Sequence, residues 1–553
     1  MRNKFILAAM LVSFIGINAQ TTPVFTMVKD INPNGDSMPT DLINYNSKIF
    51  FTADDGVNGR ELWVTDGTET KLLKDINPGE NGSDISNFKI LNGKLLFTAT
   101  DEANGNELWT TDGTAAGTTI VKDMFPGSGG SYAFEFIEFN NALYFRSEDG
   151  VHGTELWKTD GTTAGTTMVG DLRAGEFGSN PSYFTVLNNK LYFAAMDGFD
   201  YENGDKGLEL WVSDGTAAGT HIVKDINPTE SSQASTLTTF GNKIYFSAND
   251  GTNGTELWAS DGTEAGTYMV KDISNAESTD SSLPAHFIEI NGKLVFSAYT
   301  PDAGREMWTT DGTAAGTHIL KDVKAGTAGA VIPQFRHFMY KNKLLITLDD
   351  GTHGAEIWTT DGTTAGTQLY LDIFPGPDGS MNPNQAPMTF AEVNGTLYFR
   401  ALDNYDEYYQ LWKSDGTIAG TQKLLPDPTT PYNFALAQIP GFTALGDKLY
   451  FRAQYNENGY ELWSVTADAA MAVTDFNKTK FTIYPNPASD VVHISGDSNI
   501  SSVQVYDLSG KILSSQTSNS KQSQLNVSSL PKGNYIIKVL SEGKSSSYKI
   551  IKK

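Results

Sequence analysis

The 553-residue chain contains no cysteine. This absence excludes disulfide bonds, thiolate metal ligands and cysteine nucleophiles, so stability must come from packing and hydrogen bonding. Histidine is scarce, and the seven residues are scattered: His152, His221, His286, His318, His337, His353 and His493. Two of the pairs, His221/His318 and His152/His353, occupy repeat positions where other copies carry Thr, Tyr, Gln or Asn. Such interchange predicts exposed strand and turn positions and argues against a histidine metal site.

Positive charge is also in short supply. The formal net charge is −25; the first 20 residues carry +2 and residues 481–553 carry eight Lys against four acids, which leaves −31 for residues 21–480. A surface of this sign argues against nucleic acid and anionic membranes as partners.

Long apolar runs are missing after the N-terminus. The run Phe5–Ile17 follows Arg2 and Lys4 and is too short to span a bilayer. We therefore expect residues 1–19 to form a secretory signal peptide, with an N-terminal anchor as the alternative, and we expect no transmembrane segment elsewhere.

Catalytic motifs are missing as well. The sequence has no His-Glu-x-x-His, no Gly-x-Ser-x-Gly and no phosphate-binding glycine-rich loop, since Gly543-Lys544-Ser545 lacks the upstream glycine. With 65 acids in the chain, a carboxylate pair at glycosidase spacing is uninformative. The sequence predicts no catalytic residue and no cofactor.

One phrase recurs along the chain, most fully as Glu107–Thr118, which reads ELWTTDGTAAGT. The steps between consecutive copies are 46, 48, 54, 47, 50, 50, 54 and 51 residues. A period of about 50 residues is typical of an array of one supersecondary unit. The phrase contains every tryptophan of the chain: Trp63, Trp109, Trp157, Trp211, Trp258, Trp308, Trp358, Trp412 and Trp463.

Each unit has the pattern of four short strands. The second strand, such as Lys190–Phe193, is aliphatic and aromatic, and an Asp-Gly hairpin follows it in five units. The third strand is the Glu-Leu-Trp element, and the fourth, such as Val121–Met124, follows the Asp-Gly-Thr turn. Because side chains alternate, Trp109 and Leu108 face opposite ways and both faces need covering. The sequence predicts an all-β fold, a large β-propeller of four-stranded blades.

The ends of the array indicate a closed ring. The chain opens with a lone fourth strand, Met27–Ile31, and its last unit has no fourth strand after Trp463. We expect the N-terminal strand to complete the last blade, which removes both open sheet edges. About nine units are expected, and an eight-bladed ring with one irregular unit is the alternative.

The repeated residues are interpreted as frame. A catalytic residue is needed once, so the Glu that recurs before Leu-Trp predicts a hydrogen bond or ion pair inside each blade. The nine tryptophans are predicted to be core, with sugar stacking as the alternative. Asp54, Asn58 and Gly59 resemble part of a calcium loop, but Gly56 and Thr65 break that pattern, so turn capping by Asp is preferred over bound calcium.

Variation between units concentrates in two kinds of loop. One is the hairpin between the second and third strands, for example Asp197–Gly207 and Asp403–Tyr409. The other enters the next unit, for example Asn275–Pro284 and Phe374–Pro387. Variable loops on a repeated frame are where binding is expected.

The phrase resembles the ELWxxDGT repeat of secreted proteins of the Bacteroidetes, over roughly residues 24–465. The ninth copy, at Trp463, has lost the turn, and the eighth replaces Glu with Gln410. The resemblance implies a secreted repeat protein and adds no activity.

Composition changes after residue 480: serine becomes dense, tryptophan is absent and the charge reverses. The expected domains are a propeller over residues 20–465, a linker over 466–480 and a small β-sandwich over 481–553. Four motifs stand in order in the last segment: Tyr484-Pro485-Asn486-Pro487, Val503–Asp507 with Gly510, Leu530–Tyr535 with Gly533, and Lys549–Lys553.

Those motifs resemble the type A C-terminal sorting domain of the type IX secretion system, with Tyr484, Pro485, Asn486, Pro487, Gly510, Gly533, Tyr535 and Lys549 as its motif residues. An ordinary accessory sandwich is the alternative. The resemblance implies the type IX machinery as a partner and export through the periplasm to the cell surface or medium.

The hypothesis from the sequence is a secreted or cell-surface propeller that binds or adheres without catalysis, to an extracellular glycan or protein. An enzyme acting on polysaccharide is one alternative, and it predicts unique acids in one or two rim loops. A structural surface or matrix protein is the other, and it predicts self-association.

Overall fold

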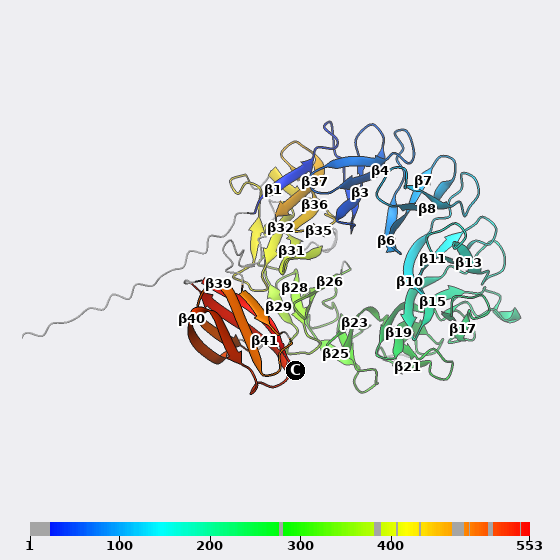
Figure 1. Ribbon diagram of the computed structural model, residues 1–553. Coiled ribbons are helices and arrows are strands. Elements are labelled where there is room, and N and C mark those ends of the chain that lie inside the picture. Colours follow the sequence, from blue (N-terminus) through cyan, green and yellow to red (C-terminus); the bar gives the residue numbers. More distant parts are fainter. Residues whose placement is uncertain are drawn as a thin grey trace, which may run out of the picture. The chain divides into compact units, whose positions relative to one another are not determined.

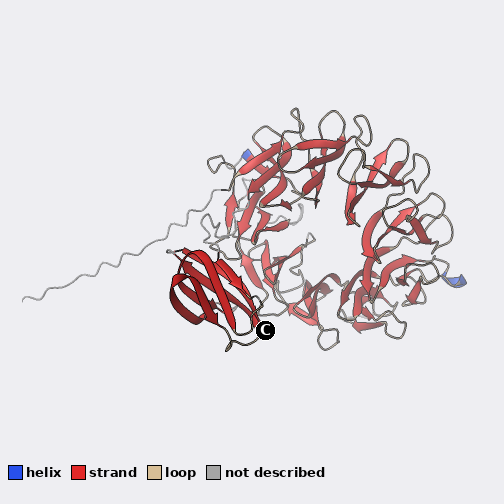
Figure 2. Ribbon diagram, viewed as in Figure 1, coloured by secondary structure: helices blue, strands red, loops and turns tan. Residues whose placement is uncertain are grey.

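The computed structural model describes residues 23–275, 280–333, 335–380, 389–404, 408–430, 433–466, 481–485, 487–506, 512–541 and 544–553. The predicted signal peptide and residues 467–480 of the predicted linker lie outside these ranges. The chain divides into two compact units, Met1–Ala470 and Met471–Lys553. Strands dominate both units (Figure 2).

Within the described residues, the first unit contains nine antiparallel sheets, which we number as blades in chain order. Blades 1 to 4 consist of β2 (Thr40–Tyr45), β3 (Lys48–Asp54), β4 (Arg60–Thr65) and β5 (Thr70–Lys74); β6 (Ser86–Leu91), β7 (Lys94–Asp101), β8 (Gly105–Thr111) and β9 (Thr119–Lys122); β10 (Phe134–Phe139), β11 (Ala142–Glu148), β12 (Thr154–Thr159) and β13 (Thr167–Gly170); and β14 (Ser182–Leu187), β15 (Lys190–Met196), β16 (Leu208–Ser213) and β17 (His221–Lys224), with the 3₁₀ turn η1 (Tyr201–Asn203) between β15 and β16.

The next four blades repeat the same order of strands. Blades 5 to 8 consist of β18 (Ser235–Phe240), β19 (Lys243–Asn249), β20 (Thr255–Ser260) and β21 (Tyr268–Lys271); β22 (Ala285–Ile290), β23 (Lys293–Thr300), β24 (Gly304–Thr310) and β25 (His318–Lys321); β26 (His337–Tyr340), β27 (Lys343–Asp349), β28 (Ala355–Thr360) and β29 (Gln368–Leu371); and β30 (Phe390–Val393), β31 (Thr396–Ala401), β32 (Gln410–Ser414) and β33 (Gln422–Leu424).

Blade 9 is assembled from both ends of the array. Its strands β34 (Phe434–Leu436) and β35 (Thr443–Leu445) both pair with β36 (Lys448–Tyr455), which pairs with β37 (Tyr460–Thr466). The N-terminal strand β1 (Phe25–Lys29) pairs antiparallel with β37, with Phe25 opposite Val465. The predicted closure of the last blade by the N-terminal strand is confirmed.

Apolar side chains join each blade to the next. Trp109 of blade 2 packs with Leu62 and Val64 of blade 1, whereas Leu108 packs with Trp157 of blade 3. One such buried cluster joins each neighbouring pair of blades, and the cluster of Trp63, Tyr450 and Leu462 joins blade 9 to blade 1. The blades therefore form a closed ring, which Figure 1 shows running from blue through green and yellow to orange at β36 and β37. The predicted all-β propeller of about nine blades is confirmed.

The fourth strands differ in position from the prediction. They were expected at Met27–Ile31 and Val121–Met124, and the structure has them at Phe25–Lys29 and Thr119–Lys122. The amides of Ile31 and Met124 donate to buried glutamate carboxylates instead of to a neighbouring strand. Each strand ends where a side chain replaces the sheet partner.

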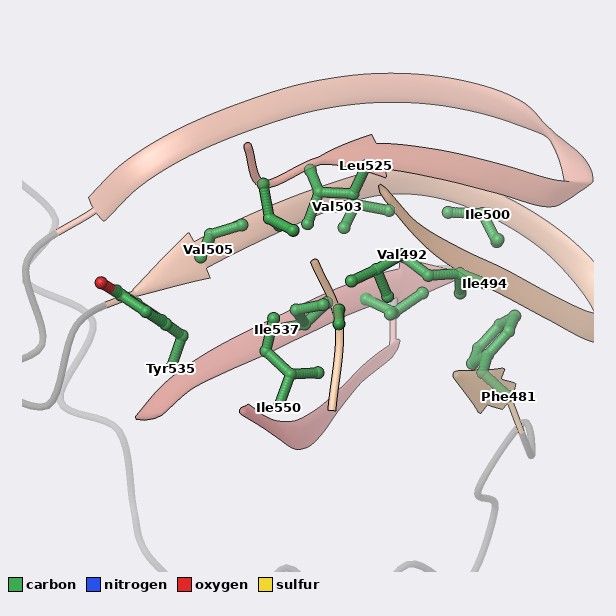
Figure 3. Packing of buried hydrophobic residues seen from close by; sticks show 13 residues of the cluster. Phe481, Val492, Ile494, Ile500, Val503, Val505, Leu525, Tyr535, Ile537 and Ile550 are labelled. Carbon is green, nitrogen blue, oxygen red and sulfur yellow. The ribbon is translucent and has the colours of Figure 1, made fainter. Parts of the chain in front are cut away.

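The second unit has five strands: β38 (Phe481–Tyr484), β39 (Val491–Tyr506), β40 (Ile512–Asn526), β41 (Gly533–Ser541) and β42 (Lys544–Lys552). The long β39 pairs with β38 along its first half and with β41 along its second half, and β40 follows it throughout. The expected small β-sandwich is therefore built from one continuous sheet. Val503, Leu525, Ile537 and Ile550 are among the apolar side chains that it encloses (Figure 3).

The tryptophan contacts generate a stability prediction. Trp109 is 6% exposed, so replacing it with Ala leaves a cavity between blades 1 and 2 and is expected to lower the free energy of unfolding by about 3–5 kcal/mol. Val57, 70% exposed on a hairpin of the same ring, provides the control, because Val57→Ala is expected to change stability by less than about 0.5 kcal/mol. Equal denaturant midpoints for the two variants would contradict this packing.

Candidate functional site

A buried glutamate carboxylate ties each regular blade to the loop that leads to the next. Glu107 on β8 accepts hydrogen bonds from the amides of Met124 and Phe125, both at 3.0 Å, and from Ser131 Oγ at 2.7 Å. Met124 and Phe125 follow β9, and Ser131 lies in the loop entering blade 3. The same residue is fully buried in eight blades: Glu61, Glu107, Glu155, Glu209, Glu256, Glu306, Glu356 and Glu461. The hydrogen-bonding role predicted for this glutamate agrees with these contacts.

Burial shifts the acidity of these carboxyl groups. Loss of hydration raises the pKa of Glu107, Glu306 and Glu356 to about 7 and that of Glu209 to about 8, although hydrogen bonds to each carboxylate oppose the shift. Blade 8 carries Gln410 instead, whose amide nitrogen donates to the Phe434 carbonyl at 2.9 Å. The eighth copy therefore keeps a tie to the following blade without the buried charge.

The repeated tryptophans lie between blades. Trp412 is half-buried, and each of the other eight is less than 9% exposed. Lys122 lies over the Trp157 ring at 5.6 Å and donates to the Thr166 carbonyl at 2.8 Å. The pairs Lys29/Trp63, Lys224/Trp258, Lys271/Trp308 and Lys321/Trp358 repeat this cation–π contact. Apart from Trp412, these rings are therefore too deeply buried to stack on a sugar.

In both kinds of Asp-Gly turn, the Asp carboxylate accepts hydrogen bonds from residues of the same turn. In the Asp-Gly-Thr turn, Asp112 accepts from the amide and hydroxyl of Thr114, and these bonds lower its pKa. In the hairpin between the second and third strands, Asp55 accepts from the amides of Val57 and Asn58, and from the Asn58 side chain at 2.8 Å. Turn capping accounts for these oxygens, and within the described residues no cluster of three His, Asp or Glu side chains is arranged to hold a metal ion.

Two histidines take part in the same hairpin contact. His152 Nδ1 lies 2.8 Å from Asp149 Oδ2, and His353 Nδ1 lies 2.7 Å from Asp350 Oδ2. These bonds raise the pKa of both imidazoles. Sequence reasoning placed both residues in turns and missed the pairing. The available signal was that each stands three residues after an Asp, where Asn58 stands in blade 1.

The remaining histidines do not converge. His221 and His318 are exposed on fourth strands, as expected. His286 Nδ1 lies 2.9 Å from Ser297 Oγ, and its ring lies 4.6 Å from the Phe335 ring. His337 is on β26. His493 stacks on Tyr484 in the second unit.

Two adjoining cavities lie where the ends of the array meet. One, of about 600 Å³, is lined by Tyr408, Asn433, Ala435, Gln454, Asn456, Glu457 and Asn458. The other, of about 390 Å³, is lined by Asp30, Pro33, Asn34, Gly35, Asp36, Gln454, Glu457, Asn458 and Gly459. Because they share Gln454, Glu457 and Asn458, we treat them together as the closure groove. Their volumes fall in the range of ligand sites.

Another cavity, of about 650 Å³, lies between blades 2 and 3 and includes the exposed Tyr132. Of the variable hairpins expected to carry binding, Asp403–Tyr409 contributes Tyr408 to the closure groove. The main contribution comes from the blade 9 hairpin, Asn456–Gly459, which sequence reasoning did not single out.

The sorting motif residues fall in the second unit. Tyr484 is 50% exposed and ends β38, and its ring stacks on His493 at 5.3 Å, ahead of Pro485 and Pro487. Gly533 begins β41, Tyr535 is buried and donates to the Pro531 carbonyl at 2.7 Å, and Lys549 is on β42. Asn486 and Gly510 lie outside the described residues.

Residues 482–553 match the model of the secretion system C-terminal sorting domain. This is the sorting domain of type IX secretion, and it directs export to the cell surface or medium. Among the described residues, the structure contains no helix with the length and apolarity needed to cross a membrane. No curated protein matches the chain significantly.

Several solved structures are similar at low identity. A prolyl endopeptidase is 13% identical over 68% of this chain and 56% of its own, with a TM-score of 0.37. A puromycin-hydrolyzing peptidase of Mycobacterium tuberculosis is 9% identical over 67% of this chain and 58% of its own, with a TM-score of 0.35. PorZ, a bacterial surface component of the type-IX secretion system of Porphyromonas gingivalis, is 12% identical over 94% of this chain and 82% of its own, with a TM-score of 0.25. The chain thus spans little more than half the length of the two peptidases, and these values transfer no activity.

The raised pKa values generate a pH prediction. For a carboxyl group whose folded pKa exceeds its unfolded value of about 4.3, the stabilising contribution is complete below that value and is lost as pH rises through the folded pKa. The melting temperature is therefore expected to fall between pH 5 and pH 8.5. Glu209→Gln removes one such group, whose folded pKa is about 8, and is expected to flatten this slope.

The control for this experiment is His152→Asn, which places at that position the residue found at Asn58, Asn104 and Asn253. The raised pKa of His152 also makes stability fall with rising pH, over a window that begins near pH 6.5. Glu209→Gln should therefore alter the slope already between pH 5 and 6, where His152→Asn leaves it unchanged. A melting temperature that rises throughout this range in the wild type would contradict the assignment.

The sorting domain generates a localisation prediction. Deletion of residues 482–553 is expected to trap the propeller in the periplasm of a type IX-competent host, because this segment carries the match to the sorting domain. Cell fractionation and immunoblotting measure the distribution, with a Val57→Ala chain as the exported control. Surface or medium levels equal to that control would contradict the role of the segment.

Proposed function

We propose that the protein is a non-catalytic binding module that type IX secretion delivers to the cell surface or medium. This proposal rests on a difference between the repeated residues, whose polar groups are hydrogen-bonded within the blades, and the closure groove, whose polar side chains face a cavity. The repeated Glu, Trp and Asp side chains are occupied in holding the blades, as Glu107 and Asp112 illustrate. Polar side chains of the groove, such as Gln454 and Asn458, line open space instead.

The character of the groove supports binding over catalysis. Among the residues that line it, side-chain amides outnumber acids by five to three. Hydrolysis of a glycosidic bond ordinarily requires two carboxyl groups held in distinct environments across the scissile bond. Amide side chains supply paired donors and acceptors, which suit recognition of a polar ligand.

The sequence resemblance to the ELWxxDGT repeat of secreted Bacteroidetes proteins supports the same proposal. We assign residues 24–465 to that repeat type on the eight Asp-Gly-Thr copies and on the Trp period. The acidic surface of this region favours an uncharged or basic ligand over an anionic one.

The test is a panel of immobilised polysaccharides incubated with the purified chain from residue 20, with and without calcium. Retention on the polysaccharide and release of new reducing ends are measured in the same wells. Retention without release is the expected result. Release of reducing ends would replace the binding module with a polysaccharide-active enzyme, and self-association without retention would replace it with a structural matrix protein.

A further inference from the structure

The closure groove exists because two distant segments meet. The hairpin Asn456–Gly459 lies directly on the N-terminal segment that follows β1: a Cβ on Gly459 would approach the Gly35 carbonyl oxygen to 2.6 Å. The amide of Tyr460 donates to Asp36 Oδ1 at 2.8 Å, and the amide of Met38 donates to the Tyr460 carbonyl at 3.0 Å. The wall of the groove is thus held by a backbone contact between Met38 and Tyr460 and by the Asp36 carboxylate, which leaves the hairpin side chains out of these contacts.

The blade 9 hairpin departs from the repeat in a way that frees an amide. In five other blades, the hairpin contains an Asn or His whose side chain is hydrogen-bonded to an Asp three positions before it. These pairs are Asp55/Asn58, Asp101/Asn104, Asp149/His152, Asp250/Asn253 and Asp350/His353. In blade 9 that Asp is replaced by Tyr455, whose ring packs edge-on against Trp463 at 5.8 Å. Asn458 therefore has lost the partner that its equivalents keep.

The groove offers several free hydrogen-bonding groups. Within the described residues, the structure records no hydrogen bond from the side chains of Gln454, Glu457 or Asn458, and none from the Tyr408 hydroxyl. Asn433 Nδ2 donates to Asn456 Oδ1 at 2.8 Å, and the backbone amide of Asn456 donates to the Asn433 carbonyl at 2.9 Å, so these two residues are joined to each other at the edge of the groove. Tyr408 is 61% exposed and adds an aromatic face beside these amides.

The charge of the groove limits the class of ligand that it can bind. Its charged lining residues are Asp30, Asp36 and Glu457, and the lining set includes no Lys, Arg or His. Phosphates, sulfates and uronic acids would meet repulsion there. Side-chain amides pair with neighbouring hydroxyl groups as donor and acceptor, carboxylates accept from hydroxyls, and an exposed tyrosine covers the apolar face of a sugar ring.

We propose that the closure groove binds an uncharged polysaccharide, with Tyr408 under one sugar ring and Gln454, Glu457 and Asn458 bonded to its hydroxyl groups. This inference rests on the proposed binding function and assigns it a site and a ligand class. Segments from both ends of the blade array line the groove, so its ligand also bridges the seam of the ring.

The experiment measures the affinity of the full mature chain for soluble uncharged glucan, mannan and xylan, with alginate as the anionic probe and chitosan as the cationic one. Tyr408→Ala and the double variant Gln454→Ala/Asn458→Ala are each expected to weaken binding to the uncharged polysaccharide about tenfold, the first through loss of the aromatic contact and the second through loss of two polar contacts. The matched control is Tyr132→Ala, because Tyr132 is also 61% exposed and lines the cavity between blades 2 and 3.

The outcomes separate the site from the function. Wild-type binding that Tyr132→Ala weakens, and that the groove variants leave intact, would overturn the groove and keep the binding module. Binding confined to alginate or chitosan would overturn the ligand class, and Glu457→Gln would then abolish chitosan binding. If the wild-type chain and all the variants bind none of the polysaccharides, although each keeps the wild-type melting temperature, both proposals would be overturned.

Discussion

A carboxyl group buried in a protein interior loses its hydration, and this propeller buries eight of them at one repeated position. Hydrogen bonds offset the loss: each carboxylate receives donors from the end of a fourth strand or from the loop that enters the next blade, as Ile76, Asn77 and Ser83 supply for Glu61. The contact ends one strand, fixes the loop and so sets the place of the next sheet. The apolar faces can then meet, and the tryptophans fill the space between blades without help from disulfides.

The seam of the ring uses the same contacts with segments from opposite ends of the chain. Glu461 accepts from the amides of Ile31 and Ser37, so the N-terminal segment supplies the donors that a following loop supplies elsewhere. Lys29 then lies over Trp63 and joins blade 9 to blade 1. Closure is therefore built from ordinary blade contacts. What is unusual at the seam is the hairpin beside it, where the Asp that ties the turn in five other blades is absent and a polar groove opens.

Much of the fold was predictable because the chain repeats one unit of about 50 residues, so the copies could be compared with one another. The period of the tryptophans and the Asp-Gly-Thr turns predicted the blades, and the lone strand expected at Met27–Ile31 predicted how the last blade is completed. The groove was not predictable in the same way, since it depends on residues 33–36 lying against residues 456–459, and no local pattern reports that contact. The replacement at Tyr455 was visible in the sequence, but its meaning required the Asp55/Asn58 contact of another blade. The fourth strands end earlier than predicted because a side-chain oxygen of Glu107 accepts the hydrogen bond of the Met124 amide. The period of the sequence does not indicate such a contact.

The export route and the binding surface belong to different units, so each can change independently of the other. The sorting domain has its own core around Val503 and Ile537, and the groove is wholly within the propeller. Hydrogen exchange of the full chain, with and without bound polysaccharide, tests most directly whether the seam of the ring is the binding site. If the seam binds the polysaccharide, residues 33–38 and 454–460 gain protection and exchange in the equivalent hairpin at 101–105 stays unchanged. Protection confined to 101–105 or to the other blades, with the seam unchanged, would contradict this binding site.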